Sequence, residues 1–351
     1  MKLSRFVLIG AVLAIVIGGV VFMKNRVTSP GALQLYTWSS YFPEEMIEEF
    51  TKTTGIPVEV SYFSSNEELF AKMVAGAGGY DIIIPSDYMI ARMIQRQMLL
   101  PFDRQQLPNL AGVDAYYREL PYDKGLKFSV PFGLGYTGVI VNTKHVKVDK
   151  EVGWDILFNS PDPKHTSYLD DMREVFAMGL MHAGLPATSH DPQQLKKVAD
   201  DLLKAKSQMA MFSSEPVALL MKGELHIAHA FSAQAMQVVR ENKDFQFFFP
   251  KEGAIAWTDN YAIPKGARRP AEAHKFINFF LEPARMAKTS EAAGLGAAAK
   301  AARDLLGTEI KSNPFLYPSA QVTKRLHFLD DLTGESLTTM NRLWTEMKTH
   351  D

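Results

Sequence analysis

Apolar and polar residues alternate along the first part of the chain with the two-residue period of a β-strand. This pattern covers residues 33–38 (LQLYTW) and 56–63 (IPVEVSYF), and a short apolar run follows at 80–84. Segments typical of helices follow the three strands, over 43–55, 64–79 and 89–100. Strands that alternate with helices at this spacing predict a parallel α/β sheet.

Two of these strands end in turns that carry aromatic rings and hydroxyl groups. The sequence TWSSY at 37–41 follows the first strand, and PSDY at 85–88 follows the third. Because ligands bind beyond the carboxyl ends of strands in open parallel sheets, we expect both turns to face one crevice. Neither turn has the glycines of a phosphate-binding loop, so they offer rings and hydroxyls instead.

The rest of the chain predicts a loop-rich stretch and then a second α/β unit. Residues 101–135 contain four prolines, and TGVIVN at 137–142 has the pattern of a strand. Helix and strand patterns alternate over 167–242, two strands joined by a turn follow at 244–263, and 272–294 is strongly helical. A chain of 351 residues is long enough for two domains at roughly 150 residues each.

The N-terminus has the layout of an export signal. Lys2 and Arg5 precede 18 uncharged, mostly apolar residues, Phe6 to Met23, which as a helix would nearly span a bilayer. Residues 1–29 therefore predict a signal peptide that is cleaved or an uncleaved membrane anchor, and both readings stay open. In either case we expect the body of the protein outside the cytoplasm, with residues 6–23 as its membrane contact if uncleaved.

Charge and composition narrow the classes of function. Residues 1–26 hold four of the 38 basic residues and no acid, which leaves 34 basic against 39 acidic residues and a net charge of −5. A mildly acidic body suits a cationic ligand and disfavours nucleic-acid binding. The absence of cysteine excludes disulfides, cysteine–zinc sites and cysteine nucleophiles.

Asp171 and Glu174 form a DxxE pair at the start of a predicted helix. The spacing is typical of a capping box, in which carboxylates favour the helix N-terminus. The alternative is that the pair presents charge to a ligand.

Trp257 and Asp259 lie two residues apart in a predicted strand and therefore share one face. A ring beside a carboxylate suits an organic cation, and the alternative is a core tryptophan beside a turn aspartate. Phe231 ends another predicted strand, where aromatic residues most often belong to the core.

The sequence gives little support for a metal, a cofactor or catalysis. We discount His226 and His229 as a metal pair because a spacing of three in a strand directs them to opposite faces. The GxGxxG match at 133–138 runs into a strand rather than a helix, so we read it as a loop. No nucleophile elbow, HExxH or Walker motif is present, and we expect no catalytic residue, metal ion or cofactor.

Taken together, the motifs resemble those of the periplasmic spermidine/putrescine-binding proteins, the receptors of polyamine ABC importers. The similarity covers residues 32–350 and rests on YTWSSYFPEEMIEEFTKTTGIPV, SNEELFAKM, YDIIIPSDY, DDMREVF, PKEGAIAWTDNYAIP and INFFLEP. The resemblance implies a two-lobed, type II periplasmic-binding-protein fold with the ligand in a cleft. It also implies that lobe 1 comprises residues 30–138 and 262–310 and that lobe 2 comprises residues 139–261. The C-terminal helices, at 311–351, would pack across both lobes.

The resemblance also implies a set of ligand-binding residues: Trp38, Ser39, Tyr41, Ser86, Tyr88, Asp171, Glu174, Phe231, Trp257 and Asp259. Trp38 and Tyr41 would line one wall, Asp171, Glu174 and Asp259 would bind ammonium groups, and Trp257 would stack on the methylene chain. Three positions depart from the family pattern, where Phe231 replaces a tryptophan, Leu295 a tyrosine and Leu329 a glutamine.

We therefore expect a monomeric, non-enzymatic receptor that captures a polyamine and delivers it to the membrane subunits of an ABC importer. One alternative is a polyamine or other small-cation sensor that signals to a membrane partner, and the matched acids argue against an anion. An exported enzyme is a third alternative, which no catalytic motif supports.

Overall fold

The computed structural model describes residues 31–39, 41–76 and 79–349. The predicted export segment, residues 1–29, lies outside the described residues. Within the described ranges, no helix is both long and apolar enough to cross a membrane.

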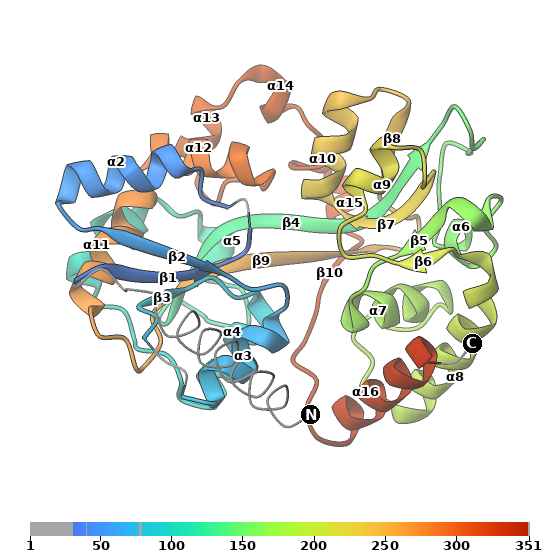
Figure 1. Ribbon diagram of the computed structural model, residues 1–351, viewed down its shortest axis with the longest axis horizontal. Coiled ribbons are helices and arrows are strands. Elements are labelled where there is room, and N and C mark those ends of the chain that lie inside the picture. Colours follow the sequence, from blue (N-terminus) through green and yellow to red (C-terminus); the bar gives the residue numbers. More distant parts are fainter. Residues whose placement is uncertain (1–30, 40, 77–78, 350–351) are drawn as a thin grey trace, which may run out of the picture.

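A ten-stranded sheet runs through the described part of the molecule in the order β2-β1-β3-β9-β4-β7-β5-β6, with β10 paired to β9 and β8 to β4 (Figure 1). Its first half is formed by β1 (Leu33–Thr37), β2 (Val58–Tyr62) and β3 (Ile82–Ile83). Its second half is formed by β5 (Thr166–Tyr168), β6 (Met211–Phe212), β7 (Ile227–Phe231) and β8 (Phe245–Phe248). The strands β4 (Ser129–Asn142) and β9 (Ala254–Ala262) join the halves, and β10 (Leu326–Phe328) pairs alongside β9.

Several strands of each half pair in parallel, as the alternating pattern predicted, whereas β7 and β8 pair antiparallel with β4. β1 pairs in parallel with β2 and β3, and β5 pairs in parallel with β6 and β7. The joining strands are antiparallel to each other. The carboxyl ends of the parallel strands therefore lie towards the middle of the molecule, where the paired strands β4 and β9 pass from one half to the other.

Helices cover both faces of each half (Figure 1). Those of the first half are α2 (Glu44–Thr54), α3 (Asn66–Val74), α4 (Asp87–Gln95), α5 (Ala115–Arg118), α11 (Pro270–Phe280), α12 (Pro283–Ala293), α13 (Lys300–Leu305) and α14 (Thr308–Lys311), with 3-10 turns η1 (Arg104–Gln106) and η2 (Pro108–Gly112). Those of the second half are α6 (Asp155–Phe158), α7 (Met172–His182), α8 (Pro192–Ala205), α9 (Val217–Met221), α10 (Ser232–Glu241) and α16 (Gly334–Thr349), with η3 (Pro163–His165) and η4 (Lys206–Gln208). The short helix α15 (Ala320–Thr323) precedes β10.

Local signals set the ends of the predicted helices. The helix α2 begins after Pro43 and ends at Gly55, which has a left-handed backbone and donates its N–H to the carbonyl of Thr51. At α3 the Ser65 hydroxyl accepts from the N–H of Glu68, which is the capping pattern expected there.

The strand β4 corrects one prediction. The stretch that we read as a loop entering a strand at residue 137 is already strand from Ser129. The backbone from Ser129 to Tyr136 pairs with β9, and a register shift between Pro131 and Gly133 accommodates the proline, which cannot donate to the ladder. A long-range partner therefore outweighs the local preference of a glycine- and proline-rich segment.

Each half has its own hydrophobic core. One cluster packs around Phe50, Phe132 and Phe276, and another around Trp154 and Phe176. Trp257 of β9 contacts both clusters from their shared boundary. The residue boundaries proposed for the two lobes stay a prediction.

Candidate functional site

The Asp259 carboxylate of β9 lies where the two ring-bearing turns of the first half meet. The hydroxyl of Tyr41, which follows β1, donates to Asp259 Oδ2, and the hydroxyl of Ser86, which precedes α4, donates to Oδ1 at 2.6 Å. The Asn66 side chain fixes Ser86 by donating to its hydroxyl and accepting from its backbone N–H. The expectation that both turns face one place is confirmed by these bonds.

Asp259 is only 2% exposed, and its surroundings act on its charge in opposite directions. Burial raises the pKa of Asp259 to about 6, although hydrogen bonds from Ser86 and Tyr41 and a weaker interaction with the Trp38 indole favour the ionised form. The indole N–H of Trp38 makes no hydrogen bond of good geometry within the described residues. A cation beside Asp259 would favour the ionised carboxylate further.

Sequence reasoning missed a second buried carboxylate, Asp87. It is the first residue of α4, is 2% exposed, and accepts backbone N–H groups from Tyr88 at 2.7 Å and Thr258 at 3.2 Å. Burial raises the pKa of Asp87 to about 7, and the negative charge of Asp259 contributes in the same direction. The available signal was its place in PSDY, between two residues that we did assign to the site.

The second half contributes Asp171 and Glu174 at the start of α7. Asp171 caps the helix by accepting the N–H groups of Arg173 at 2.9 Å and Glu174 at 3.1 Å, which confirms the cap. The returning bond from the Asp171 N–H to the Glu174 side chain, which would complete a capping box, is absent among the described residues. Burial and the charge of Glu67 raise the pKa of Asp171. The cap uses one oxygen of the carboxylate, and Asp171 is half-buried.

Glu174 is more deeply buried, at 4% exposure, and its Oε2 makes no hydrogen bond of good geometry among the described residues, although a weaker interaction with the Thr137 side chain favours the ionised form. Burial raises the pKa of Glu174 well above its ordinary value, and the charges of Asp171 and Asp87 add to the rise. Because the charge of Asp87 in the first half raises the pKa of Glu174 in the second half, carboxylates of the two halves are close enough to interact electrostatically.

The charge of Arg173 acts on Asp87 and Asp171, and its guanidinium also contacts other residues. Its guanidinium lies 4.3 Å above the Tyr88 ring and 3.8 Å from Glu67, and it also contacts Asp331 at 3.5 Å. The Tyr88 hydroxyl in turn donates to Glu67 at 3.3 Å. The Tyr88 ring is therefore covered by the Arg173 guanidinium and does not form an open wall of the site.

Aromatic rings flank the carboxylates. Trp257 packs edge to face with Phe231 at 5.6 Å, and Trp38 with Phe63 at 4.4 Å. A Cβ at Gly135 would lie 2.3 Å from the Trp257 ring, so only glycine lets the ring take this position. Trp38, Trp257 and Phe231 are half-buried, which leaves ring surface accessible.

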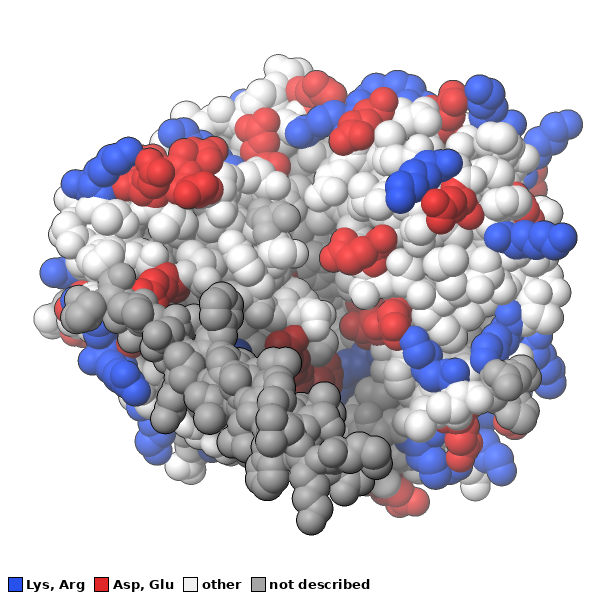
Figure 2. Space-filling model, in the orientation of Figure 1, with Lys and Arg blue, Asp and Glu red and all other residues white. Residues whose placement is uncertain are grey.

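Between the two halves, the surface of the molecule is hollowed, and acidic side chains lie in and beside the hollow (Figure 2). The structure therefore brings together Trp38, Tyr41, Ser86 and Asp259 from one side and Asp171 and Glu174 from the other, with Trp257 and Phe231 at the junction. Ser39 is exposed in the turn before Tyr41.

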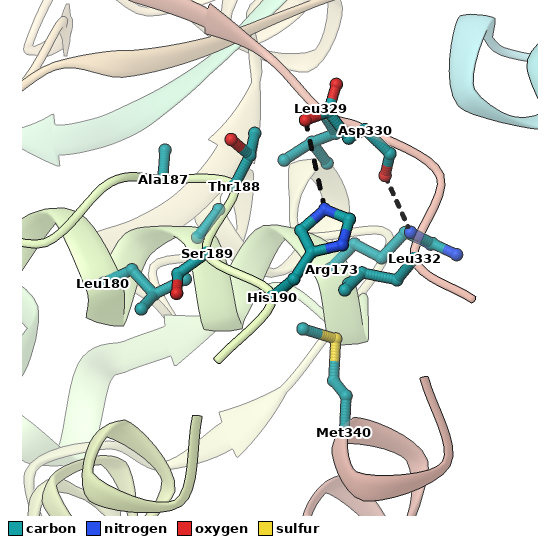
Figure 3. Close-up of a pocket in the computed structure, with 11 residues that line it drawn as sticks. Arg173, Leu180, Ala187, Thr188, Ser189, His190, Leu329, Asp330, Leu332 and Met340 are labelled. Atoms are coloured by element: carbon teal, nitrogen blue, oxygen red, sulfur yellow. Dashed lines mark hydrogen bonds and ion pairs between the residues drawn. The ribbon is translucent and has the colours of Figure 1, made fainter. Parts of the chain in front are cut away.

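Two of the positions that depart from the family pattern, Leu295 and Leu329, lie in a core and in a separate pocket. Leu295 is fully buried in the core of the first half, against Gly133. Leu329 lines a separate pocket between α7 and the C-terminal segment, where His190 lies 4.0 Å from Asp330 (Figure 3). In that pocket Arg173 donates to the Asp330 carbonyl at 3.2 Å, so its guanidinium also contacts the segment that lines this pocket.

Two α/β halves joined by long strands, with a polar and aromatic hollow between them, define a two-lobed binding-protein fold. A structure described as a putative spermidine/putrescine ABC transporter from Listeria monocytogenes superposes with a TM-score of 0.86 at 32% identity, covering 92% of this chain and 100% of that one. The predicted type II periplasmic-binding-protein fold is confirmed.

A family model described as bacterial extracellular solute-binding protein matches residues 45–317, and the chain belongs to this family. The spermidine/putrescine-binding periplasmic protein 1 of Haemophilus influenzae is 35% identical, over 93% of this chain and 91% of that protein. The putrescine/cadaverine-binding protein of Pseudomonas aeruginosa is 30% identical, over 92% of this chain and 95% of that protein. The resemblance inferred from the motifs is confirmed.

Proposed function

We propose that this protein is an extracytoplasmic receptor that captures a polyamine of the putrescine and spermidine class for an ABC importer. The observation that carries the proposal is the group of buried or half-buried carboxyl groups between the two halves: Asp87, Asp171, Glu174 and Asp259. Burial raises the pKa of each of them, so negative charge on these groups costs free energy unless a cation lies beside them. A ligand with several positive charges removes that cost.

A polyamine matches this arrangement in shape as well as charge. Its ammonium groups are separated by methylenes, and each buried ammonium needs a carboxylate because an unpaired buried charge costs several kcal/mol. Rings that cover the chain add about 0.5–2 kcal/mol for each good cation–π contact. Acids from both halves are present here together with the half-buried rings of Trp38, Trp257 and Phe231.

We assign the contacts accordingly. Asp259, oriented by Tyr41 and Ser86, binds one ammonium, and Glu174 binds another through Oε2, which makes no hydrogen bond of good geometry among the described residues. Trp257 covers the methylenes between them. Asp87 provides a further carboxylate, which favours a ligand that carries more than two charges.

Because its acids come from both halves, such a ligand binds best when the halves are close together. The ligand stabilises the closed state only by its preferential affinity for that state. Closure then presents a distinct surface to the importer's membrane subunits. In this account the protein acts as a periplasmic monomer, binds no nucleic acid and leaves its ligand chemically unchanged.

The names of the similar proteins support transport over sensing. They describe spermidine- and putrescine-binding periplasmic proteins and a spermidine/putrescine ABC transporter. None of these names supports the sensor alternative.

A thermal-shift screen of the purified full-length protein tests the proposal. Putrescine, cadaverine, spermidine and spermine are compared with 1,4-butanediol and 1,5-pentanediol, which match the two diamines in length but carry no charge. We expect at least one polyamine to raise Tm in a concentration-dependent way and the diols to have no effect. Equal responses to a diamine and its diol would show that charge is not what the site recognises.

A further inference from the structure

A second group of ligand-type side chains lies in the second half, at the opposite ends of the strands from the acidic hollow. His165 immediately precedes β5 and His226 immediately precedes β7, whereas Asp171 and Phe231 lie at the carboxyl ends of these strands. Asp162, His165 and His226 form a cluster whose ligand atoms lie within 4.8 Å of one another. From the sequence we considered His226 with His229 as a metal pair and rejected it. The sequence did not indicate that His165 lies beside His226.

The pairing of two strands brings the histidines together. Thr166 of β5 pairs in parallel with Ile227 of β7, so the residues before them are neighbours, and the N–H of His226 donates to the His165 carbonyl at 2.8 Å. The Asp162 carbonyl accepts the N–H of His165 at 3.1 Å and the Thr166 hydroxyl at 2.8 Å. The backbone of all three cluster residues is therefore fixed by the fold.

The side chains converge on one carboxylate. His165 Nδ1 lies 2.8 Å from Asp162 Oδ1, and His226 Nδ1 lies 2.7 Å from Oδ2. The His165 and His226 rings stack at 4.4 Å, and His145 stacks on His226 at 4.1 Å, so the position of the middle ring is held by its neighbours.

Solvent can reach the cluster, since the side chains of His165 and Asp162 are 40% and 26% exposed. The side chain of His226 is 12% exposed, so the cluster is neither sealed in the core nor spread over an open surface. An ion could enter from solvent and still lose part of its hydration shell.

We propose that Asp162, His165 and His226 form a site for a divalent transition-metal ion of the zinc class. Two imidazoles and a carboxylate are ligands that Zn²⁺ takes, with water completing a tetrahedron. Without the ion each Nδ1–H donates to an Asp162 oxygen, and on metal binding each neutral imidazole takes the tautomer with its proton on Nε2 and offers the Nδ1 lone pair. Metal–ligand bonds of about 2.0–2.1 Å place the ligand atoms about 3.4 Å from one another. The two imidazole nitrogens, now 2.8 and 2.7 Å from the Asp162 oxygens, would therefore move slightly away from the carboxylate to admit the ion.

The ion would clamp β5 to β7 in the second half and would not touch the hollow. Its effect is therefore separate from polyamine binding. The purified full-length protein, stripped with EDTA and dialysed, is titrated calorimetrically with ZnCl₂ alone. We expect one ion per chain with Kd on the order of 10 µM or tighter.

Substitution of the ligands tests the assignment. His165→Gln and His226→Gln should each weaken zinc binding by about tenfold or more, whereas His190→Gln, at a half-exposed histidine beside Asp330, should not change it. Co²⁺ should give visible absorption bands typical of a tetrahedral site with the parent protein, and both ligand variants should lose them. A cooperative thermal unfolding transition without zinc, measured for each variant, shows that the variant is folded.

The proposal is overturned if zinc gives no saturable binding of one ion per chain, or if both ligand variants bind zinc and cobalt as the parent does. The cluster is then a hydrogen-bond cluster that ties two strands together. If His226→Gln fails to fold, Asp162→Asn and His165→Gln carry the same test. Failure of polyamine binding leaves the zinc result unaffected, so the two proposals fail independently.

Discussion

At Asp259, hydrogen bonds and burial act on one carboxylate in opposite directions. The hydroxyls of Ser86 and Tyr41 favour the ionised form, yet burial raises the pKa to about 6. Asp87 has the same conflict, with a pKa of about 7. The sequence could identify Asp259 because it shares a strand face with Trp257. It did not show that Asp87 is buried, because the backbone N–H that Asp87 accepts from Thr258 lies 171 positions away along the chain.

The raised pKa values of Asp87 and Asp259 predict opposite pH trends for stability and binding. Between about pH 4 and pH 7 these groups hold more protons in the folded than in the unfolded ligand-free protein, so their contribution to the free energy of unfolding falls as pH rises. Spermidine stays positively charged over this range and needs ionised partners. Its affinity should therefore be about tenfold or more weaker at pH 5 than at pH 8.

Calorimetric titrations at several pH values measure the binding trend, and urea denaturation measures the stability trend. Glu174 and Asp171, whose pKa values are also raised, act in the same direction, and Arg173 opposes them at Asp87 and Asp171. Affinity that is constant from pH 5 to pH 8 would contradict a role for these carboxylates in the site.

Glu174→Gln separates charge from packing. Because burial raises the pKa of Glu174 well above its ordinary value, the neutral amide resembles the protonated acid in shape and charge. The free energy of unfolding without ligand should change by less than about 1 kcal/mol, while spermidine affinity should fall by about tenfold or more. Urea denaturation and calorimetry on the same sample check both, and retained affinity would remove Glu174 from the site.

At the scale of elements, local chemistry set some boundaries and long-range pairing set others. The start of α3 follows from Ser65 and the end of α2 from Gly55, and both could be read from the sequence. The first part of β4 could not be read, because Ser129 to Tyr136 is strand only through its partner β9. At α7 the sequence pattern allowed two interpretations of Asp171, a helix cap or a ligand contact, and the observed cap does not exclude contact with a ligand.

Two substitutions at Asp171 distinguish these readings. Asp171→Asn keeps an effective N-cap and removes the charge, whereas Asp171→Ala removes both. We expect the alanine variant to lose about 1 kcal/mol of stability and the asparagine variant much less. Spermidine affinity should fall in both variants. Normal affinity in Asp171→Asn would mean that Asp171 serves as a cap alone.

At the scale of the whole molecule, a buried ionic contact links the two halves through the C-terminal segment. Asp331 accepts from Arg92 of α4 at 2.5 Å and lies 3.5 Å from Arg173 of α7. Arg92 also donates to the Leu332 carbonyl at 3.1 Å. The sequence predicted C-terminal helices packed across the lobes, but these partners are 239 and 158 positions apart, and no local pattern reports them.

Asp331→Asn should weaken this contact because it removes the carboxylate that Arg92 contacts and leaves Arg173 with Glu67 alone. We expect a loss of roughly 3 kcal/mol in the free energy of unfolding. Asp330→Asn is the matched control, since the neighbouring side chain is 63% exposed and only its backbone carbonyl binds Arg173. Equal stability of the two variants in urea denaturation would contradict a structural role for the ionic contact.

The most direct test of polyamine capture is a calorimetric titration of the purified protein with putrescine and spermidine, repeated with Asp259→Asn. Asp201→Asn, at an exposed acid on α8, serves as the control. The account predicts one ligand per chain with Kd on the order of 10 µM or tighter. It also predicts affinity about tenfold or more weaker in Asp259→Asn and unchanged in Asp201→Asn. Absence of binding heat with both amines, or equal affinity in Asp259→Asn, would contradict it.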